Sequence, residues 1–341
     1  MIYRSKAPLR IGLAGGGTDV SPYSDLYGGA ILNLTISLSA YANIELTSDN
    51  EIVLQAFDRK EVERYPVSTF LEINGTLDLL KGVYNRVMKD YPFSPRGMKI
   101  STFVDAPAGS GLGTSSTLVV AILGAFAEML KLPLGDYDLA QYAYEIERVD
   151  LKLAGGKQDQ YAATFGGVNY MEFLPNDNVI VNPLRIRTEY LHELENNLLL
   201  FYTDSSRESA RIIEEQQKNV HNQKEKSIEA MHRLKEQAQQ MKEALLKGKL
   251  NQIGEILDYG FRQKKLMADK ISNDSIEEVY ELAIRSGAAG GKISGAGGGG
   301  FMIFYCPANN RYPVIEALKA VRGQVMPYTF THHGLQTWTI S

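Results

Sequence analysis

A glycine-rich turn at residues 105–116 is the stretch whose residue types most directly suggest chemistry. It reads Asp-Ala-Pro-Ala-Gly-Ser-Gly-Leu-Gly-Thr-Ser-Ser, and an apolar run at 117–130 follows it. Alternating glycines can adopt positive φ angles and leave backbone N–H groups unobstructed. Thr-Ser-Ser supplies good helix N-caps, so free amides and the positive end of a helix point at one spot. We therefore expect a cradle for a nucleotide polyphosphate; a turn that only caps a buried helix is the alternative. The residues expected there are Gly109, Ser110, Gly111, Leu112, Gly113, Thr114, Ser115 and Ser116.

A second glycine turn near the N-terminus is followed by a carboxylate. Residues 2–14 alternate loosely like a strand and break at three consecutive glycines, with Asp19 two positions further on. A carboxylate just past such a turn can approach a ligand closely and accept hydrogen bonds from sugar hydroxyls. A role for Asp19 as an ordinary turn or cap residue fits the spacing equally well.

Three more acidic side chains lie near a third glycine turn. The helix predicted over 136–150 carries Glu145 and Glu147 near its end, where acids oppose the helix dipole and are either solvated or held by a cation. Residues 154–161, Ala-Gly-Gly-Lys-Gln-Asp-Gln-Tyr, then present Asp159. A further glycine-rich loop at 292–300 leads into an apolar run that reads as a strand.

Several common nucleotide motifs do not fit these turns. A P-loop requires Lys after its last glycine, where this chain has Thr114. Gly295, Gly297 and Gly300 have the G-x-G-x-x-G spacing of dinucleotide-binding proteins, but their loop precedes a strand instead of opening a helix. The His-Arg-Asp and Asp-Phe-Gly elements of protein kinases are missing from the sequence.

Hydrophobic periodicity predicts the elements that must position these turns. We expect strands at 2–14, 30–47, 51–57, 98–104, 168–173, 179–184, 198–202 and 301–305, with two more near the C-terminus. We expect helices at 77–91, 114–130, 136–150, 222–247, 250–271, 275–286 and 313–321, and a helix start at 203–206. A shift in composition near 187–197 indicates a boundary between domains at 1–190 and 191–341.

Composition and charge narrow the class of protein. The 341 residues are 44% hydrophobic and 22% charged with a formal charge of −4, so neither nucleic acid nor an anionic membrane is an expected partner. The single cysteine, Cys306, excludes an intrachain disulfide, fits a buried structural thiol and favours a cytoplasmic setting. We find no signal peptide, membrane span or zinc spacing, and the His332-His333 pair has no nearby acid or cysteine.

Three of the glycine segments, in this order, resemble the motifs of the GHMP kinases, the superfamily of galactokinase, homoserine kinase, mevalonate kinase and phosphomevalonate kinase. Residues 7–19 are similar to the first motif, 107–116 to the second and 292–300 to the third. Within this superfamily, the segments Leu-Ala-Gly-Gly-Gly-Thr-Asp and Gly-Gly-Lys-Gln-Asp-Gln-Tyr most resemble those of the D-glycero-D-manno-heptose 7-phosphate kinases. The resemblance implies an α+β fold, with an N-terminal domain like the second domain of ribosomal protein S5 and a ferredoxin-like C-terminal domain.

The resemblance also implies roles for individual residues. Asp159 matches the family's catalytic aspartate, and Arg10 matches the basic residue that faces it. The turn at 109–116 would wrap the ATP phosphates, with Ser116 and Glu147 as Mg²⁺ ligands and Glu145 as the alternative acid. For a substrate phosphate we expect a basic group, Arg207, just after the helix start at 203–206. The alternative is that Arg207 is a solvated surface residue. The substrate-binding residues we expect are Gly16, Gly17, Thr18, Asp19, Gly297 and Arg207.

The expected activity is ATP- and Mg²⁺-dependent phosphorylation of the anomeric hydroxyl of D-glycero-D-manno-heptose 7-phosphate to the 1,7-bisphosphate. Gly16-Gly17 replaces the Glu-His of galactokinases, which argues against galactose. A kinase for fucose or another free sugar is the alternative, followed by a non-catalytic sugar or ATP sensor and an ATP-dependent decarboxylase. Asp159 and Arg10 together favour an enzyme, because a sensor needs no base. The sequence gives no indication of an oligomer.

Overall fold

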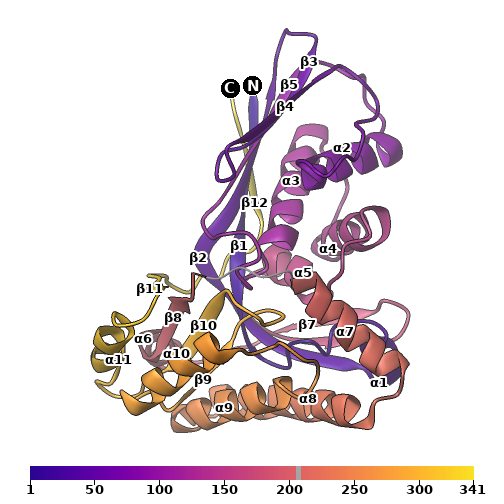
Figure 1. The fold of residues 1–341 in the computed structure, drawn as a ribbon. Coiled ribbons are helices and arrows are strands. Elements are labelled where there is room, and N and C mark those ends of the chain that lie inside the picture. Colours follow the sequence, from indigo (N-terminus) through magenta and orange to yellow (C-terminus); the bar gives the residue numbers. More distant parts are fainter. Residues whose placement is uncertain (205–208) are drawn as a thin grey trace.

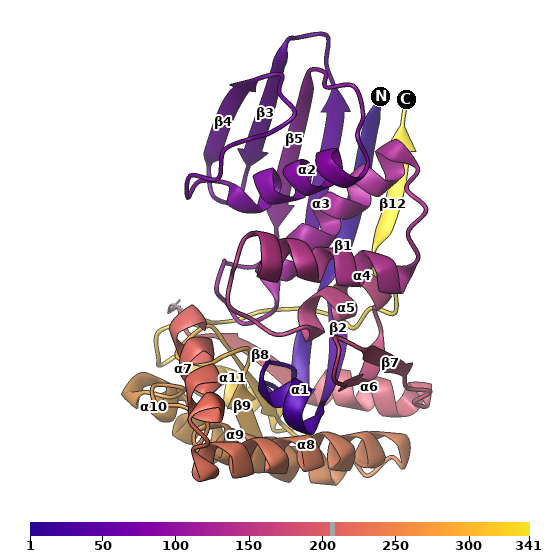
Figure 2. The same cartoon turned by 90° about the vertical axis from the view of Figure 1, so that its right-hand side faces the viewer.

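The computed structural model describes residues 1–204 and 209–341, and two β-sheets organise that part of the chain (Figures 1 and 2). The larger sheet has the order β12-β1-β2-β5-β3-β4, and β6 followed by β7 extends it from β2. Its strands are β1 (Ile2–Ala14), β2 (Gly29–Leu46), β3 (Glu51–Ala56), β4 (Glu61–Pro66), β5 (Met98–Val104), β6 (Val168–Phe173), β7 (Val179–Pro183) and β12 (Gln336–Ile340).

The smaller sheet is antiparallel and has the order β11-β8-β10-β9. Its strands are β8 (Leu198–Tyr202), β9 (Gly290–Ile293), β10 (Phe301–Tyr305) and β11 (Gln324–Val325). All residues of β8, β9 and β10 are buried, which fits the continuous apolar sequences of β8 and β10, while the one charged residue among them, Lys292 of β9, donates to the Gly12 carbonyl at 2.7 Å. Two strongly apolar sheets with helices against them account for the α+β architecture.

Helices cover these sheets, and one of them opens at the glycine-rich turn. The helices are α1 (Tyr23–Tyr27), α2 (Asp78–Asp90), α3 (Thr114–Leu130), α4 (Asp136–Glu145), α5 (Gln158–Phe165), α6 (Thr188–Asn197), α7 (Ser209–His221), α8 (Glu225–Leu246), α9 (Ile253–Lys264), α10 (Asp274–Arg285) and α11 (Arg311–Leu318). A turn of π-helix (Ile146–Asp150) follows α4, and a turn of 3₁₀-helix (Leu250–Gln252) precedes α9. Because α3 is apolar nearly all round, it packs against β1 and β2 and is itself covered by α2 and α4.

The strand β2 ties the two halves of the molecule together. Its first part, Gly29–Leu34, pairs with β6, and its last part, Ala40–Leu46, pairs with β5, while β1 runs antiparallel along most of its length. Both long strands descend from the larger sheet to the region of α8 (Figure 2). Consequently β1 delivers Arg10 and the first glycine turn to the level where the two halves meet.

Most predicted elements are confirmed within one to three residues. The helix predicted over 250–271 is an exception, since it ends at Lys264, and the helix start expected at 203–206 lies partly outside the described residues. Strand β4 was not predicted, because it is an edge strand that alternates charged and apolar residues and leaves Val62 half exposed. The helix predicted over 222–247 is α8, and α7 precedes it as a separate helix. The chain turns between them at Gln223, which has a positive φ of 53°.

The predicted helix 136–150 is correct in position but not in kind. The α-helix ends at Glu145, and a π-helical turn continues to Asp150. In a continuous α-helix Val149 would follow the buried Ile146 by three residues on the same face, but it is exposed because the wider turn shifts that face. The same turn carries Glu147 inward, to 1% exposure.

The ends of the chain meet on the larger sheet. Strand β12 pairs with β1, from Ile2 against Ile340 to Lys6 against Gln336, although β12 follows the whole second half in sequence (Figure 1). The boundary at 190/191 stays a prediction, and the last strand returns to the first sheet.

Cys306 is buried, and burial raises the pKa of its thiol to about 12. Among the described helices, none has the length and apolar character needed to cross a bilayer.

Candidate active site

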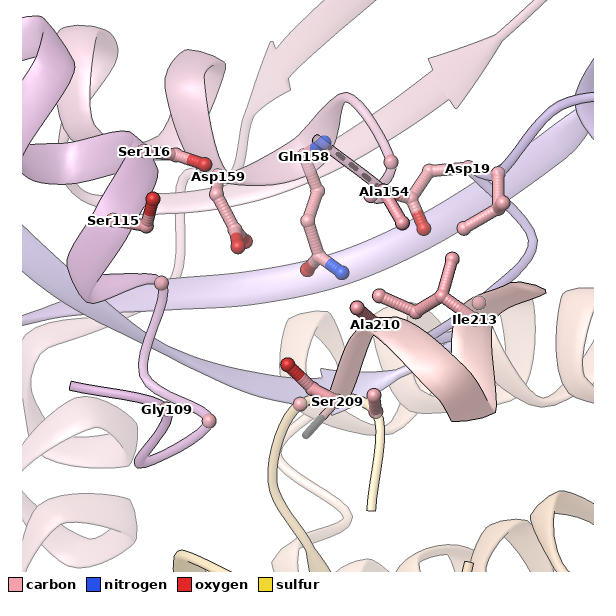
Figure 3. Close-up of a pocket in the computed structure, with 18 of the residues that line it drawn as sticks. Asp19, Gly109, Ser115, Ser116, Ala154, Gln158, Asp159, Ser209, Ala210 and Ile213 are labelled. Carbon is pink, nitrogen blue, oxygen red and sulfur yellow. Dashed lines mark hydrogen bonds between the residues drawn. The ribbon is translucent and has the colours of Figure 1, made fainter. Parts of the chain in front are cut away.

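A cavity of about 300 Å³ lies where the glycine turns of both halves converge (Figure 3). One wall is the turn at 109–116 with the residues from Leu153 to Asp159, and Figure 3 shows Ser115, Ser116 and Asp159 on it. The first turn of α7 and the loop from Ser294 to Gly299 face that wall from the other half of the molecule. A cleft with these walls can hold two reactants against one another.

The glycine-rich turn has the conformation that its sequence predicted. Gly109, Gly111 and Gly113 have φ angles of 71°, 86° and 79°, and α3 begins at the next residue, Thr114. Its backbone is held against the last glycine loop: the Phe301 N–H donates to the Ser110 carbonyl at 2.8 Å, and the Ser294 hydroxyl donates to the Gly111 carbonyl at 2.8 Å. The turn therefore depends on contacts from the second half of the chain.

Gly111→Ala is expected to damage both stability and nucleotide binding. A Cβ there would lie 2.6 Å from the Ser294 carbonyl oxygen, and the positive φ alone costs about 1–2 kcal/mol. Chemical denaturation and calorimetric titration with ATP measure the two effects. Gly75→Ala is the matched control, because Gly75 also has a positive φ, of 95°, but nothing within 4 Å of its Cβ position. Equal losses for both variants would show that the contact with Ser294 does not matter.

Arg10 and Asp159 form a buried ion pair at the cavity wall. The Arg10 Nε and Nη2 atoms lie 2.7 and 2.6 Å from Asp159 Oδ1, and Arg10 Nη1 donates to the Gly111 carbonyl at 2.6 Å. The arginine side chain is 4% exposed and the aspartate side chain 20%. Both contacts between Arg10 and Asp159 are to Oδ1, and the Asp159 carboxylate points into the cavity (Figure 3). The second carboxylate oxygen, Oδ2, is thus placed to accept a hydrogen bond from a bound hydroxyl.

Glu147 lies beside the start of α3, and Glu145 does not. The Ser115 hydroxyl donates to Glu147 Oε1 at 2.8 Å, and Gln160 Nε2 donates to Glu147 Oε2 at 2.7 Å and to Ser116 Oγ at 3.1 Å. Glu145 instead pairs with Arg86 at 2.7 Å, outside the cavity. Of the two acids that the sequence left open, the structure brings only Glu147 to the glycine turn.

The residues around Glu147 fit a magnesium ion. Mg²⁺ in phosphoryl-transfer sites takes oxygen ligands, commonly one or two carboxylates together with substrate phosphates and water. Glu147 is a buried carboxylate next to two serine hydroxyls, and its cationic neighbour in the described chain is Arg148, at 3.4 Å. The described residues include no group of three or more His, Cys, Asp or Glu suited to a metal. Phosphate oxygens and water would therefore have to complete the coordination.

Asp19 caps the start of α5, one of the two roles that its sequence position left open. Its Oδ2 accepts hydrogen bonds from the Lys157 and Gln158 N–H groups at 2.9 and 3.0 Å, at the start of α5, and it also lines the cavity (Figure 3). Burial raises the pKa of Asp19, and the bond from the Gln158 N–H acts in the opposite direction. The carboxylate thus caps α5 from a distant segment and lines the cavity, while its role toward a ligand stays a prediction.

The remaining expected site residues divide into lining and supporting positions. Gly17, Gly297, Gly109, Gly111, Gly113 and Thr114 line the cavity. The Thr18 hydroxyl donates to the carbonyls of Gly15 and Ala30, which holds the first glycine turn closed. Arg207 lies outside the described residues. Gly16, Thr18, Ser110 and Leu112 are not among the lining residues.

Several polar residues of the cavity were not found from the sequence. Arg148 donates to the Ser116 hydroxyl at 3.3 Å, and its position next to Glu147 is a signal that could have found it. Gln158 lies in the Gly-Gly-Lys-Gln-Asp-Gln-Tyr stretch, directly before Asp159. Gln216 and Lys264 come from α7 and α9, where ordinary amphipathic sequence gives no indication of a site.

Comparisons with known proteins agree with this geometry. The protein-family model described as GHMP kinases N terminal domain matches residues 78–167, and the family model described as GHMP kinases C terminal matches residues 241–323. The chain is 47% identical over 337 residues to a D-glycero-alpha-D-manno-heptose 7-phosphate kinase of Campylobacter jejuni, with 99% of each chain covered.

Solved structures show the same fold. A D-glycero-D-manno-heptose 1-phosphate kinase from Bacteroides thetaiotaomicron is 48% identical, with a TM-score of 0.85 and 99% of each chain covered. The mevalonate kinase of Methanococcus jannaschii, at 20% identity, has a TM-score of 0.76 over 97% of this chain and 98% of that one. The second likeness concerns the fold alone, and together they confirm the two-part α+β architecture.

Proposed function

The chain belongs to the GHMP kinases, and we propose that it transfers the γ-phosphoryl group of ATP to the anomeric hydroxyl of D-glycero-D-manno-heptose 7-phosphate. The resemblance carried by the three glycine segments is thus confirmed, and the sugar and the position of transfer are the proposal. The observation that carries it is the Arg10–Asp159 pair beside a glycine turn that opens α3. A nucleotide cradle next to an aspartate with a free oxygen is an arrangement for phosphoryl transfer to a hydroxyl.

Positioning and electrostatics account for most of the catalysis in such a reaction. The amides of the turn at 109–116 would bind the ATP phosphates, and Asp159 would orient the acceptor hydroxyl or accept its proton. Arg10 holds Asp159 through the ion pair and places positive charge near the group in transfer. Ser116 and Glu147 would hold Mg²⁺, which supplies neutralisation of the phosphate charge. Asp19 would accept hydrogen bonds from the sugar.

The choice of a heptose phosphate follows the relatives of high identity. One relative is named as a heptose 7-phosphate kinase and another as a heptose 1-phosphate kinase, so their names differ on which phosphate is involved. We propose the 7-phosphate as substrate and the anomeric oxygen as acceptor. A kinase for a free sugar such as fucose is the second candidate. The intact Arg10–Asp159 pair supports an enzyme over a binding protein without activity.

A substrate comparison tests the proposal. We expect kcat/KM for D-glycero-D-manno-heptose 7-phosphate to exceed that for unphosphorylated heptose and L-fucose by roughly 10²–10⁴-fold, because an uncharged sugar would leave the donors of a phosphate site unpaired. Coupled ADP release measures the rates, and ³¹P coupling to the anomeric proton identifies the position of transfer. Equal use of the free sugar would overturn the substrate assignment. Absence of ADP release with every sugar tested would favour the sensor.

A further inference from the structure

Lys264 is a buried cation in the cavity wall that the proposed chemistry does not use. The residue is 2% exposed, and its ammonium group donates to the Gly295 carbonyl at 2.5 Å. No carboxylate of the described chain forms an ion pair with it, although an ammonium has three N–H groups to satisfy. Burial, and after it the positive charge of Arg10, lower the pKa of Lys264 to about 8, while Asp19 acts in the opposite direction. A buried charge with one neutral partner is costly unless a ligand completes it.

Gln216 is a second incomplete donor at the same place. It belongs to α7, is 2% exposed and lines the cavity, and its Nε2 group has no hydrogen-bond partner in the described chain. The two side chains meet the same turn: a Cβ on Gly16 would lie 3.7 Å from Lys264 Nζ, and one on Gly17 would lie 3.5 Å from Gln216 Oε1. The ammonium and the amide, from two helices, thus lie against neighbouring glycines of one turn, and the Met267 methyl lies 2.6 Å from the Cβ position of Gly17.

Gln216 lies on the side of the cavity near Asp19, whereas Lys264 lies nearer the glycine turn, because its partner Gly295 packs against Gly111. Ile213 lies across the cavity from the wall with Ser115 and Ser116, near Asp19 (Figure 3). Gln216 follows Ile213 by one helical turn on the same face of α7, further from the start of that helix. The glycine turn and Arg10 already supply donors on the nucleotide side. Gln216 adds a donor on the other side of the cavity, and the Lys264 ammonium adds a positive charge near enough to Arg10 and Asp19 for their charges to act on it, so a second anion could bind there.

We propose that Lys264 and Gln216 bind the phosphate that the sugar substrate already carries, and so select a phosphorylated sugar over a free one. Both groups present N–H donors, which match the acceptor oxygens of a phosphate, and the ammonium adds the charge that a free hydroxyl would not require. This inference rests on the proposed function and names the residues behind its specificity. The competing source of the same chemistry is the γ-phosphate of ATP.

Lys264→Met separates these sources by the substrate that it affects. We expect KM for heptose 7-phosphate to rise by roughly 10–100-fold, while KM for unphosphorylated heptose and KM for ATP change less than about threefold. The melting temperature is expected to stay the same or rise, because a buried cation with one neutral partner is replaced by an apolar side chain of similar length. Lys265→Met is the matched control: it removes the neighbouring charge, which pairs with Glu277 at 2.9 Å outside the cavity, and should leave all three KM values unchanged.

Gln216→Leu provides an independent variant that keeps the charge of the site. We expect a smaller rise in KM for heptose 7-phosphate, roughly 5–20-fold, again without a change for the free sugar. Gln217→Leu is its control, since Gln217 donates to the Ser21 carbonyl at 3.1 Å and does not line the cavity. Calorimetric titration of both variants with heptose 7-phosphate in the absence of ATP measures the same loss without turnover.

Each other outcome overturns the inference. Equal losses for both sugars, with a raised KM for ATP, would assign Lys264 to the transferred phosphoryl group. Unchanged KM values in Lys264→Met and Gln216→Leu would show that neither binds a phosphate. If Lys264→Met does not fold, the Gln216→Leu titration decides. Failure of the proposed function would appear in the wild-type protein, as a lack of preference for the phosphorylated sugar, before any variant is made.

Discussion

Asp159→Asn is expected to lower kcat by roughly 10²–10⁴-fold, the usual contribution of a positioned acid–base group, which corresponds to about 3–5 kcal/mol of activation free energy. The asparagine cannot accept a proton, although it can occupy the same space between Arg10 and the cavity. Nucleotide affinity should change little, because the amides of the glycine turn are untouched. Initial rates of ADP release and calorimetric titration with ATP give the two quantities.

The same substitution also leaves Arg10 as a buried charge with no anionic partner, which lowers stability by an amount that must be separated from catalysis. The double variant Arg10→Met/Asp159→Asn removes that charge and is expected to recover melting temperature without recovering kcat. Asp138→Asn, at the start of α4, is the control for the chemical change alone. A kcat near the wild-type value in a folded Asp159→Asn protein would remove Asp159 from the chemistry.

Glu147→Ala is expected to raise the Mg²⁺ concentration for half-maximal activity by more than roughly 10–100-fold. Removing a group that only hydrogen-bonds to a metal ligand typically has an effect of that size, and Glu147 would be a ligand itself. Glu147 supplies the buried carboxylate next to the Ser115 and Ser116 hydroxyls, and those hydroxyls carry no charge to replace it. Ser116→Ala should have a smaller effect in the same direction. Titration of activity with Mg²⁺ at saturating ATP measures both, and Mn²⁺ binding in the presence of ATP gives a readout without turnover.

Glu145→Ala is the control that the sequence itself provides, because Glu145 is the other acid of the same segment. It pairs with Arg86 at 2.7 Å and should leave the Mg²⁺ requirement unchanged. The reverse pattern, with a shift for Glu145→Ala and none for Glu147→Ala, would move the metal ligand by two residues and contradict the site as the structure describes it.

The sequence by itself determined the features that depend on a few neighbouring residues. The positive φ angles of Gly109, Gly111 and Gly113 and the start of α3 at Thr114 follow from glycine's freedom and from the helix periodicity behind it. The same local logic located β1, β5, α2 and α10 nearly to the residue. The sequence also singled out Asp159 beside a glycine turn, and it left Glu145 and Glu147 open as the second acid. Local signals of this kind, together with the resemblance of the glycine segments, sufficed for the family.

Only the tertiary structure decided which distant groups meet. Arg10 and Asp159 are 149 residues apart and become an ion pair because β1 and α5 pack side by side. The π-helical turn after α4, which brings Glu147 inward and leaves Glu145 outside, changes the residue face without a sequence signal that periodicity can detect. Lys264 and Gln216 lie on amphipathic helices whose polar residues look solvated in sequence. Whether such a residue faces water or a cavity depends on how its helix is docked against the rest of the chain, and contacts between distant residues set that orientation.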